Sequence, residues 1–135
     1  MIREPQPGTP IEELDTPALL VDLEALAHNL ESIARFFADK TARLRPHAKT
    51  HKCSQIALRQ LAAGAVGITC AKLGEAEVLA EAGVRDILIA NQIVGAPKLE
   101  RLTALAHTCD VMVAVDDEAN VADLGRACRE RGVSI

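Results

Sequence analysis

Short apolar runs alternate with helix-forming segments along most of this chain. The clearest run, Ile87-Leu88-Ile89-Ala90, is apolar at every position, as is typical of a strand buried on both faces. We predict strands over 19–21, 43–49, 66–71, 86–91 and 111–115, and a further strand that opens at 133–135. We predict helices over 22–39, 54–64, 75–82, 97–107 and 118–131. Strands that alternate with helices indicate an α/β fold with a parallel sheet and helical crossovers.

The number of strand–helix units limits which α/β fold is possible. Four units from Arg43 onward are followed by only three residues of a fifth strand. A closed (β/α)₈ barrel needs about 250 residues, and a flavodoxin-like sheet would need a complete fifth strand and a final helix. We therefore expect these 135 residues to form about half of a barrel, within a longer parent chain.

Composition argues against several classes of partner. The formal net charge is −4 and aromatic residues make up 1% of the chain, so neither a basic patch nor a base-stacking surface for nucleic acid is expected. No apolar run is long enough to span a bilayer. The segment Met1–Pro10 lacks the apolar core of a signal peptide. We therefore expect no nucleic-acid and no membrane partner.

The cysteines indicate the compartment. They are widely spaced and form no Cys-x-x-Cys pair: Cys53, Cys70, Cys109 and Cys128. This spacing predicts reduced thiols and a cytoplasmic protein rather than a disulfide framework. We expect the four residues to serve as small core side chains.

The segment from Leu44 to Cys53, which combines the predicted strand over 43–49 with the turn after it, is rich in polar residues. Side chains alternate along a strand, so Arg45, His47 and Lys49 are expected on one face and Leu44, Pro46 and Ala48 on the other. Buried lysine and arginine are costly unless they are paired. This row therefore predicts a functional surface rather than ordinary core.

The residues alone leave several functions open for this surface. His47 and His51 could ligate zinc together with Cys53, or the row around Lys49 could bind an anion or a partner protein. Three further polar residues end strands and would lie at the same rim, where each is interpreted as a hydrogen-bonding or capping residue before a catalytic one: Lys72, Asn91 and Asp116.

Four segments of the chain, in order, resemble one enzyme family. They are Leu14–Asp22 (LDTPALLVD), Leu44–Lys52 (LRPHAKTHK), Gly74–Glu77 (GEAE) and Asn91–Gly95 (NQIVG). The resemblance is to the D-threonine aldolase / D-serine dehydratase family, which are alanine-racemase-type, fold type III pyridoxal-phosphate enzymes. It implies that residues 1–135 are the N-terminal half of an alanine-racemase-type (β/α)₈ TIM barrel, with 1–13 as an N-terminal extension. The second barrel half and a C-terminal β-domain would be absent from these residues.

The resemblance also implies roles for individual residues. Lys49 matches the catalytic lysine that forms a Schiff base with pyridoxal 5'-phosphate, and Arg45, His47 and His51 are expected beside the same cofactor. A lysine must be neutral to attack an aldehyde, and positively charged neighbours favour the neutral amine. The family also uses a divalent metal, zinc or manganese, whose ligands would lie outside this chain, so we predict no metal ligand within it.

The function implied is a pyridoxal-phosphate-dependent lyase that acts on a small β-hydroxy-D-amino acid, by aldol cleavage or by dehydration. The parent is expected to be a cytoplasmic homodimer, and residues 1–135 alone are expected to be inactive. Two alternatives stay open, namely a non-catalytic pyridoxal-phosphate-binding protein of the same fold group and a stand-alone α/β binding module.

Overall fold

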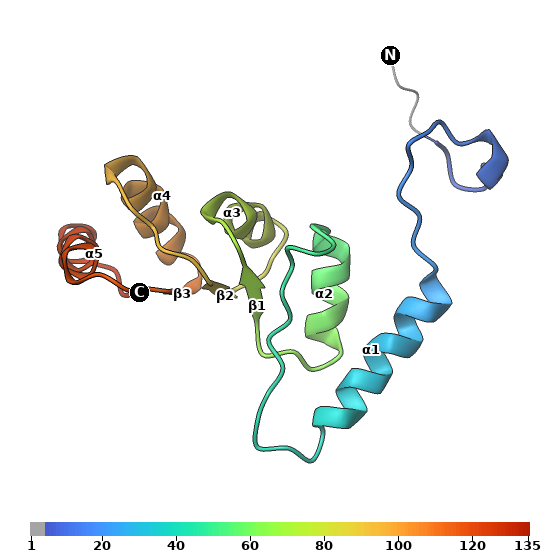
Figure 1. Cartoon of the computed structure of the whole chain (residues 1–135), viewed down its shortest axis with the longest axis horizontal. Helices are drawn as coiled ribbons and strands as arrows, with labels where there is room; N and C mark the ends of the chain where they lie inside the picture. Colours follow the sequence, from blue (N-terminus) through green and yellow to red (C-terminus); the bar gives the residue numbers. More distant parts are fainter. Residues whose placement is uncertain (1–4) are drawn as a thin grey trace.

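A three-stranded parallel sheet organises the chain. The computed structural model describes residues 5–135. Within them, β1 (Ile68–Cys70), β2 (Asp86–Ile89) and β3 (Asp110–Val113) pair side by side in sequence order. The helices are η1 (Ile11–Glu13, a 3₁₀ turn), α1 (Leu23–Phe37), α2 (Ser54–Ala62), α3 (Leu73–Glu81), α4 (Ala96–Ala106) and α5 (Glu118–Arg131). Figure 1 shows α2 to α5 following one another along the same side of the strands.

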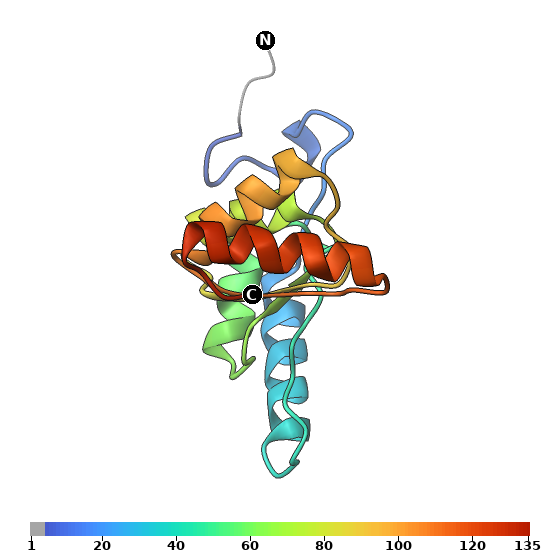
Figure 2. The ribbon, with the colours of Figure 1, turned by 90° about the vertical axis from the view of Figure 1, so that its left-hand side faces the viewer.

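The core lies between the sheet and that layer of helices. Its largest buried side chains include Ile68, Ile87, Ile89, Val111 and, on α4, Leu102. Burying an aliphatic side chain of this size contributes about 1.5–3 kcal/mol. Figure 2 shows α5 at the end of the helix series, nearest the viewer. The predicted α/β topology, with parallel strands and helices on one side, is therefore confirmed.

Helix α1 stands apart from this core. Asp22 caps it as predicted, because its carboxylate accepts the backbone N–H groups of Glu24 and Ala25, each at 2.9 Å. None of its residues is buried, and the side chains of Leu23 and Phe36 are 59% and 60% exposed. Figure 1 shows α1 diverging from the strands. Its apolar stripe therefore has no partner among residues 5–135.

Two of the predicted strands do not form. Residues 19–21 are apolar and residues 133–135 are apolar except for Ser134, but neither segment pairs with a strand, and Leu19 is 89% exposed. An isolated segment has no partner for its backbone N–H and C=O groups. An apolar run by itself was therefore insufficient evidence for a strand at these two places.

The predicted strand over 43–49 is mostly irregular. Its single bridge pairs His47 with Thr69 in parallel, through Thr69 N–H to Pro46 C=O and Ala48 N–H to Thr69 C=O, both 2.8 Å. Pro46 has no N–H to donate to the ladder. Below it the register shifts by one residue, because Val66 rather than Gly67 donates to the Leu44 carbonyl, at 2.9 Å. The segment thus runs beside β1 without becoming a regular strand.

Candidate functional site

Lys49 follows the segment that runs beside β1. The chain turns after Ala48, whose carbonyl accepts the N–H of Lys52 at 2.8 Å. Lys49 is exposed, and its Nζ has no hydrogen-bond or ion-pair partner in the part of the chain that the structure describes. Because Ala48 bonds to Thr69 near the end of β1, Lys49 lies at the carboxyl ends of the strands. Enzymes with parallel barrels place their reactive groups at this end.

Two histidines flank Lys49 and are held in the same way. His47 Nδ1 accepts the N–H of Lys49 at 3.2 Å, and His51 Nδ1 accepts the N–H of Cys53 at 3.1 Å. A neutral imidazole that accepts at Nδ1 carries its proton on Nε2, so each ring presents one donor. His51 Nε2 is buried and has no partner among residues 5–135. A buried donor without an acceptor fits a site for an oxygen-rich group, such as the phenolic oxygen or phosphate of pyridoxal phosphate.

Lys52 lies in the turn, three residues after Lys49. It adopts a left-handed backbone conformation, with φ of 48°, which is unusual for a side-chain-bearing residue. Together with Ala48, Ser54 and Lys72 it lines a cavity of about 390 Å³ that continues along α3. Lys52 and Lys72 therefore both line the cavity beside α3. Lys49 is not among the residues that line it.

The rim at the carboxyl ends is tied together by side chains. Asn91 Nδ2 donates to the Ala71 carbonyl at 3.2 Å, and Gln92 Nε2 donates to Asp116 Oδ2 at 2.9 Å. Lys72 is the residue before the first turn of α3. These contacts agree with the interpretation of Asn91 and Asp116 as rim hydrogen-bonding residues.

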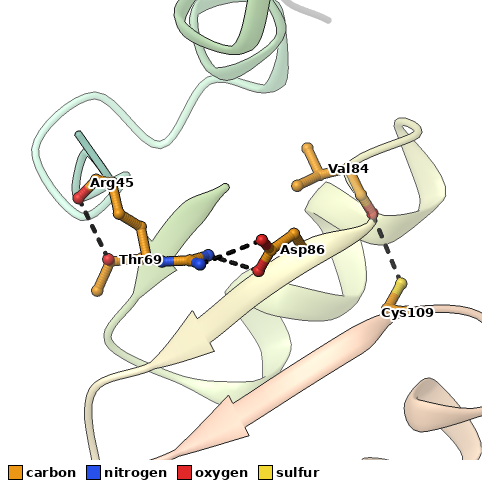
Figure 3. Close-up of polar contacts among 5 residues, drawn as sticks. All are labelled: Arg45, Thr69, Val84, Asp86 and Cys109. Atoms are coloured by element: carbon orange, nitrogen blue, oxygen red, sulfur yellow. Dashed lines mark hydrogen bonds and ion pairs between the residues drawn. The ribbon is translucent and has the colours of Figure 1, made fainter. Parts of the chain in front are cut away.

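Arg45 lies at the opposite end of the strands from Lys49. Its Nη1 and Nη2 donate to Asp86 Oδ1 and Oδ2 at 2.6 and 3.1 Å, and Asp86 is the first residue of β2 (Figure 3). Because the guanidinium is engaged at the amino ends of the strands, the structure does not bring it to the cofactor position predicted for it. Alternation along a strand predicted which face Arg45 lies on, but not which end of the strands its side chain reaches. Nothing local in the sequence indicated Asp86 as its partner, which is 41 residues away.

Gly67 provides the space for this ion pair. A Cβ at residue 67 would lie 2.0 Å from Arg45 Nη1 and 2.6 Å from the backbone oxygen of Asp86. Gly67→Ala is therefore expected to lower the free energy of unfolding by about 1–3 kcal/mol, because the clash involves backbone.

Gly74→Ala is the matched control for that substitution. A Cβ there would meet only Arg101 Nη2, at 3.9 Å, and replacing a helical glycine by alanine stabilises by about 0.5–1 kcal/mol. Urea unfolding of both variants in the full-length protein measures the difference. A Gly67→Ala protein as stable as the unsubstituted one would contradict the packing described here.

Two of the four cysteines, Cys70 and Cys109, belong to the core, whereas Cys53 and Cys128 are only partly buried, contrary to the prediction for them. Burial, and to a lesser extent the carboxylate of Glu75, raises the pKa of the Cys70 thiol to about 12. The buried Cys109 Sγ donates to the Val84 carbonyl at 3.5 Å (Figure 3). A nucleophile or metal ligand would be a thiolate, so Cys70 and Cys109 are core residues, as predicted. All four cysteines, which lie within residues 5–135, are free thiols.

Residues 5–135 hold neither a metal-binding cluster nor a membrane-spanning helix. No group of three His, Cys, Asp or Glu side chains is placed there to hold a metal ion, including the set of His47, His51 and Cys53. No helix in the same range combines the length and apolar character needed to cross a bilayer.

Comparison with known proteins identifies the relatives of this arrangement. Residues 21–135 match the family described as alanine racemase, N-terminal domain. The chain is 43% identical over 130 residues to D-threonine aldolase from Arthrobacter sp., covering 96% of this chain and 34% of the relative. It is 36% identical over 131 residues to 3-hydroxy-D-aspartate aldolase from Paracoccus denitrificans, with the same two shares. The chain thus spans about a third of the length of the curated relatives it matches.

Solved structures agree with the sequence matches. The crystal structure of D-threonine aldolase from Filomicrobium marinum superposes with a TM-score of 0.89 at 47% identity, over 93% of this chain and 34% of that chain. A variant of D-threo-3-hydroxyaspartate dehydratase in the metal-free form superposes with a TM-score of 0.79 at 38% identity, over 91% of this chain and 32% of that chain. The resemblance and the half-barrel fold inferred from the sequence are both confirmed.

Proposed function

The chain belongs to the alanine racemase N-terminal domain family, and we propose that the protein containing it is a pyridoxal-phosphate-dependent lyase acting on β-hydroxy-D-amino acids. The observation that carries the proposal is the position of Lys49 at the carboxyl ends of parallel strands, two residues before His51, whose buried Nε2 has no hydrogen-bond partner among residues 5–135. The names of the relatives support the substrate class, since D-threonine and 3-hydroxy-D-aspartate are both β-hydroxy-D-amino acids.

Lys49 would hold the cofactor covalently through Nζ. Its exposed side chain can reach a ligand without breaking an existing ion pair in the described structure. The Lys49 backbone is fixed by its N–H bond to His47, so the two residues are oriented together. The neighbouring imidazoles add hydrogen-bond donors, of which His51 Nε2 is already removed from water. When bound, pyridoxal phosphate withdraws electron density from the substrate Cα and so favours cleavage of a bond beside it.

The remaining parts of such an enzyme are assigned to chain outside residues 1–135. These parts are the second barrel half, the C-terminal β-domain and the ligands of a divalent metal, zinc or manganese. The metal-free form of the related dehydratase supports metal use in the family. We further propose a cytoplasmic homodimer, and the free thiols of all four cysteines, each within residues 5–135, support the reducing compartment.

Turnover by the full-length protein tests this function. The purified protein, supplied with pyridoxal phosphate and Mn²⁺ or Zn²⁺, is expected to convert D-threonine or 3-hydroxy-D-aspartate to glycine and an aldehyde, or to ammonia and a keto acid. The L-enantiomers are expected to react at least about tenfold more slowly, a difference of roughly 1.4 kcal/mol in the barrier. Cofactor binding without turnover of any of these amino acids would instead identify the non-catalytic cofactor-binding protein. Failure to bind the cofactor would favour a stand-alone binding module.

A further inference from the structure

We propose that Arg45 and Asp86 form a clasp that positions the Lys49-bearing segment, residues 44–53, from the end of the strands opposite to the reactive amine. The clasp consists of the Arg45–Asp86 pair and the glycine it crosses, Gly67. Arg45 is thereby assigned as a positioning residue rather than as a cofactor ligand. The inference rests on the proposed function for its catalytic consequence, but not for its structural one.

The clasp lies where the backbone hydrogen bonds between the segment and β1 are interrupted. On the Lys49 side of the clasp, two bonds join Thr69 to residues 46 and 48. At the level of Gly67, Pro46 can donate no hydrogen bond, and the register slips by one residue. The side chain of Arg45 leaves the segment at this point and bonds to β2, one strand farther on, by passing over Gly67. A side-chain bond therefore substitutes for the missing main-chain one.

The geometry of the pair is suited to fixing a position. Two parallel N–H···O bonds hold the planar guanidinium against the carboxylate, and such a bidentate pair restricts orientation more than a single contact does. The side chains of Arg45 and Asp86 are only 20% and 35% exposed, so water screens the pair less than a surface pair. Thr69 Oγ1 also donates to the Arg45 carbonyl at 3.4 Å, which links the clasp to the strand that forms the bridge with His47 (Figure 3).

Past Ala48 the chain leaves the sheet. Among residues 5–135, the hydrogen bonds of residues 49–52 stay within the segment, such as Lys49 N–H to His47 Nδ1, Thr50 Oγ1 to the His47 carbonyl and Lys52 N–H to the Ala48 carbonyl. Small errors in the placement of a reactive group reduce the rate and the affinity of a site strongly. Loosening the amino end of the segment is therefore expected to act at Lys49 through the backbone.

Four variants of the full-length holoprotein test the clasp. Asp86→Asn and Arg45→Lys each remove the bidentate pair with little change in volume, and the double variant measures their coupling. Arg101→Lys is the matched control, because Arg101 also forms a bidentate pair, with Glu77, but between α4 and α3. Two quantities are measured: amide hydrogen exchange of the peptide 44–53, and the dissociation constant of pyridoxal phosphate from titration of its visible absorbance.

The clasp predicts the same change in both single variants. Amide exchange in 44–53 should become about tenfold faster, and the dissociation constant of pyridoxal phosphate should rise about tenfold. Losing one charge-assisted hydrogen bond has an effect of this size. The double variant should lose no more than either single one, and Arg101→Lys should change neither quantity. A purely global structural role would lower the melting temperature without accelerating exchange selectively in 44–53.

Other results would overturn the inference. Weak cofactor binding in Arg45→Lys with normal binding in Asp86→Asn would show that Arg45 contacts the cofactor directly. Unchanged exchange in 44–53 would show that the pair does not hold the segment. If the unsubstituted protein bound no cofactor, the proposed function would fail, whereas the exchange measurement would still decide whether the clasp exists.

Discussion

Replacement of Lys49 by arginine in the full-length protein is expected to lower turnover by about a thousandfold or more and to abolish covalent retention of pyridoxal phosphate. Arginine keeps the length and the positive charge of the side chain, so the exposed position should tolerate it without loss of folding. A guanidinium stays protonated at accessible pH and cannot condense with an aldehyde. The expected signature is therefore a folded protein that has lost the visible absorbance of lysine-bound cofactor.

Two lysines of the same region provide the controls for this substitution. Lys52→Arg and Lys72→Arg should retain the absorbance and most of the turnover, because both side chains line the cavity beside α3 rather than the position of Lys49. Full activity of Lys49→Arg would contradict the covalent role assigned to Lys49. Loss of the absorbance in Lys52→Arg alone would transfer that role to Lys52.

The isolated polypeptide 1–135 is expected to have no measurable lyase activity and to self-associate. In it, the outer edge of β3 carries unpaired backbone groups, and open edges of this kind pair with other chains. Exposed apolar side chains, such as Leu19, Leu23 and Phe36, also favour association with other chains. The polypeptide also lacks the second barrel half and the metal ligands that we assign to the rest of the protein.

Light scattering after gel filtration, together with an assay on D-threonine and 3-hydroxy-D-aspartate, measures both parts of this expectation. The full-length protein in the same buffer is the control. A monomeric 1–135 polypeptide that turns over either amino acid, and loses that turnover on Lys49→Ala, would contradict the prediction.

The strands of the sheet could be predicted because each carries its own signal. Ile87-Leu88-Ile89 is apolar throughout and is followed by a helix, and such a pattern depends little on the rest of the chain. Leu19-Leu20-Val21 has a similar composition but no neighbouring strand, so its apolar character did not lead to pairing. Strand formation depends on a partner, and a single sequence does not show where the partner lies.

The candidate site was predictable in part for the same reason. The residue types around Lys49 and the turn that carries them follow from local sequence, whereas the place of Arg45 depends on a contact with Asp86, 41 residues away. Arg45 precedes Lys49 by four residues, about 13 Å along an extended chain. Alternation assigned these residues to one face, but it did not predict that they lie at opposite ends of the strands. Pro46 argues against a regular strand in this segment, because proline has no N–H to donate to the ladder.

Borohydride reduction of the holoprotein followed by peptide mapping shows directly whether Lys49 carries the cofactor. Reduction converts the bond between the lysine and pyridoxal phosphate into a stable adduct, which mass spectrometry assigns to one residue. A pyridoxyl group is expected on Lys49, in the peptide that also contains His47 and His51. An adduct on Lys52 or Lys72, or no adduct in residues 1–135, would contradict this expectation.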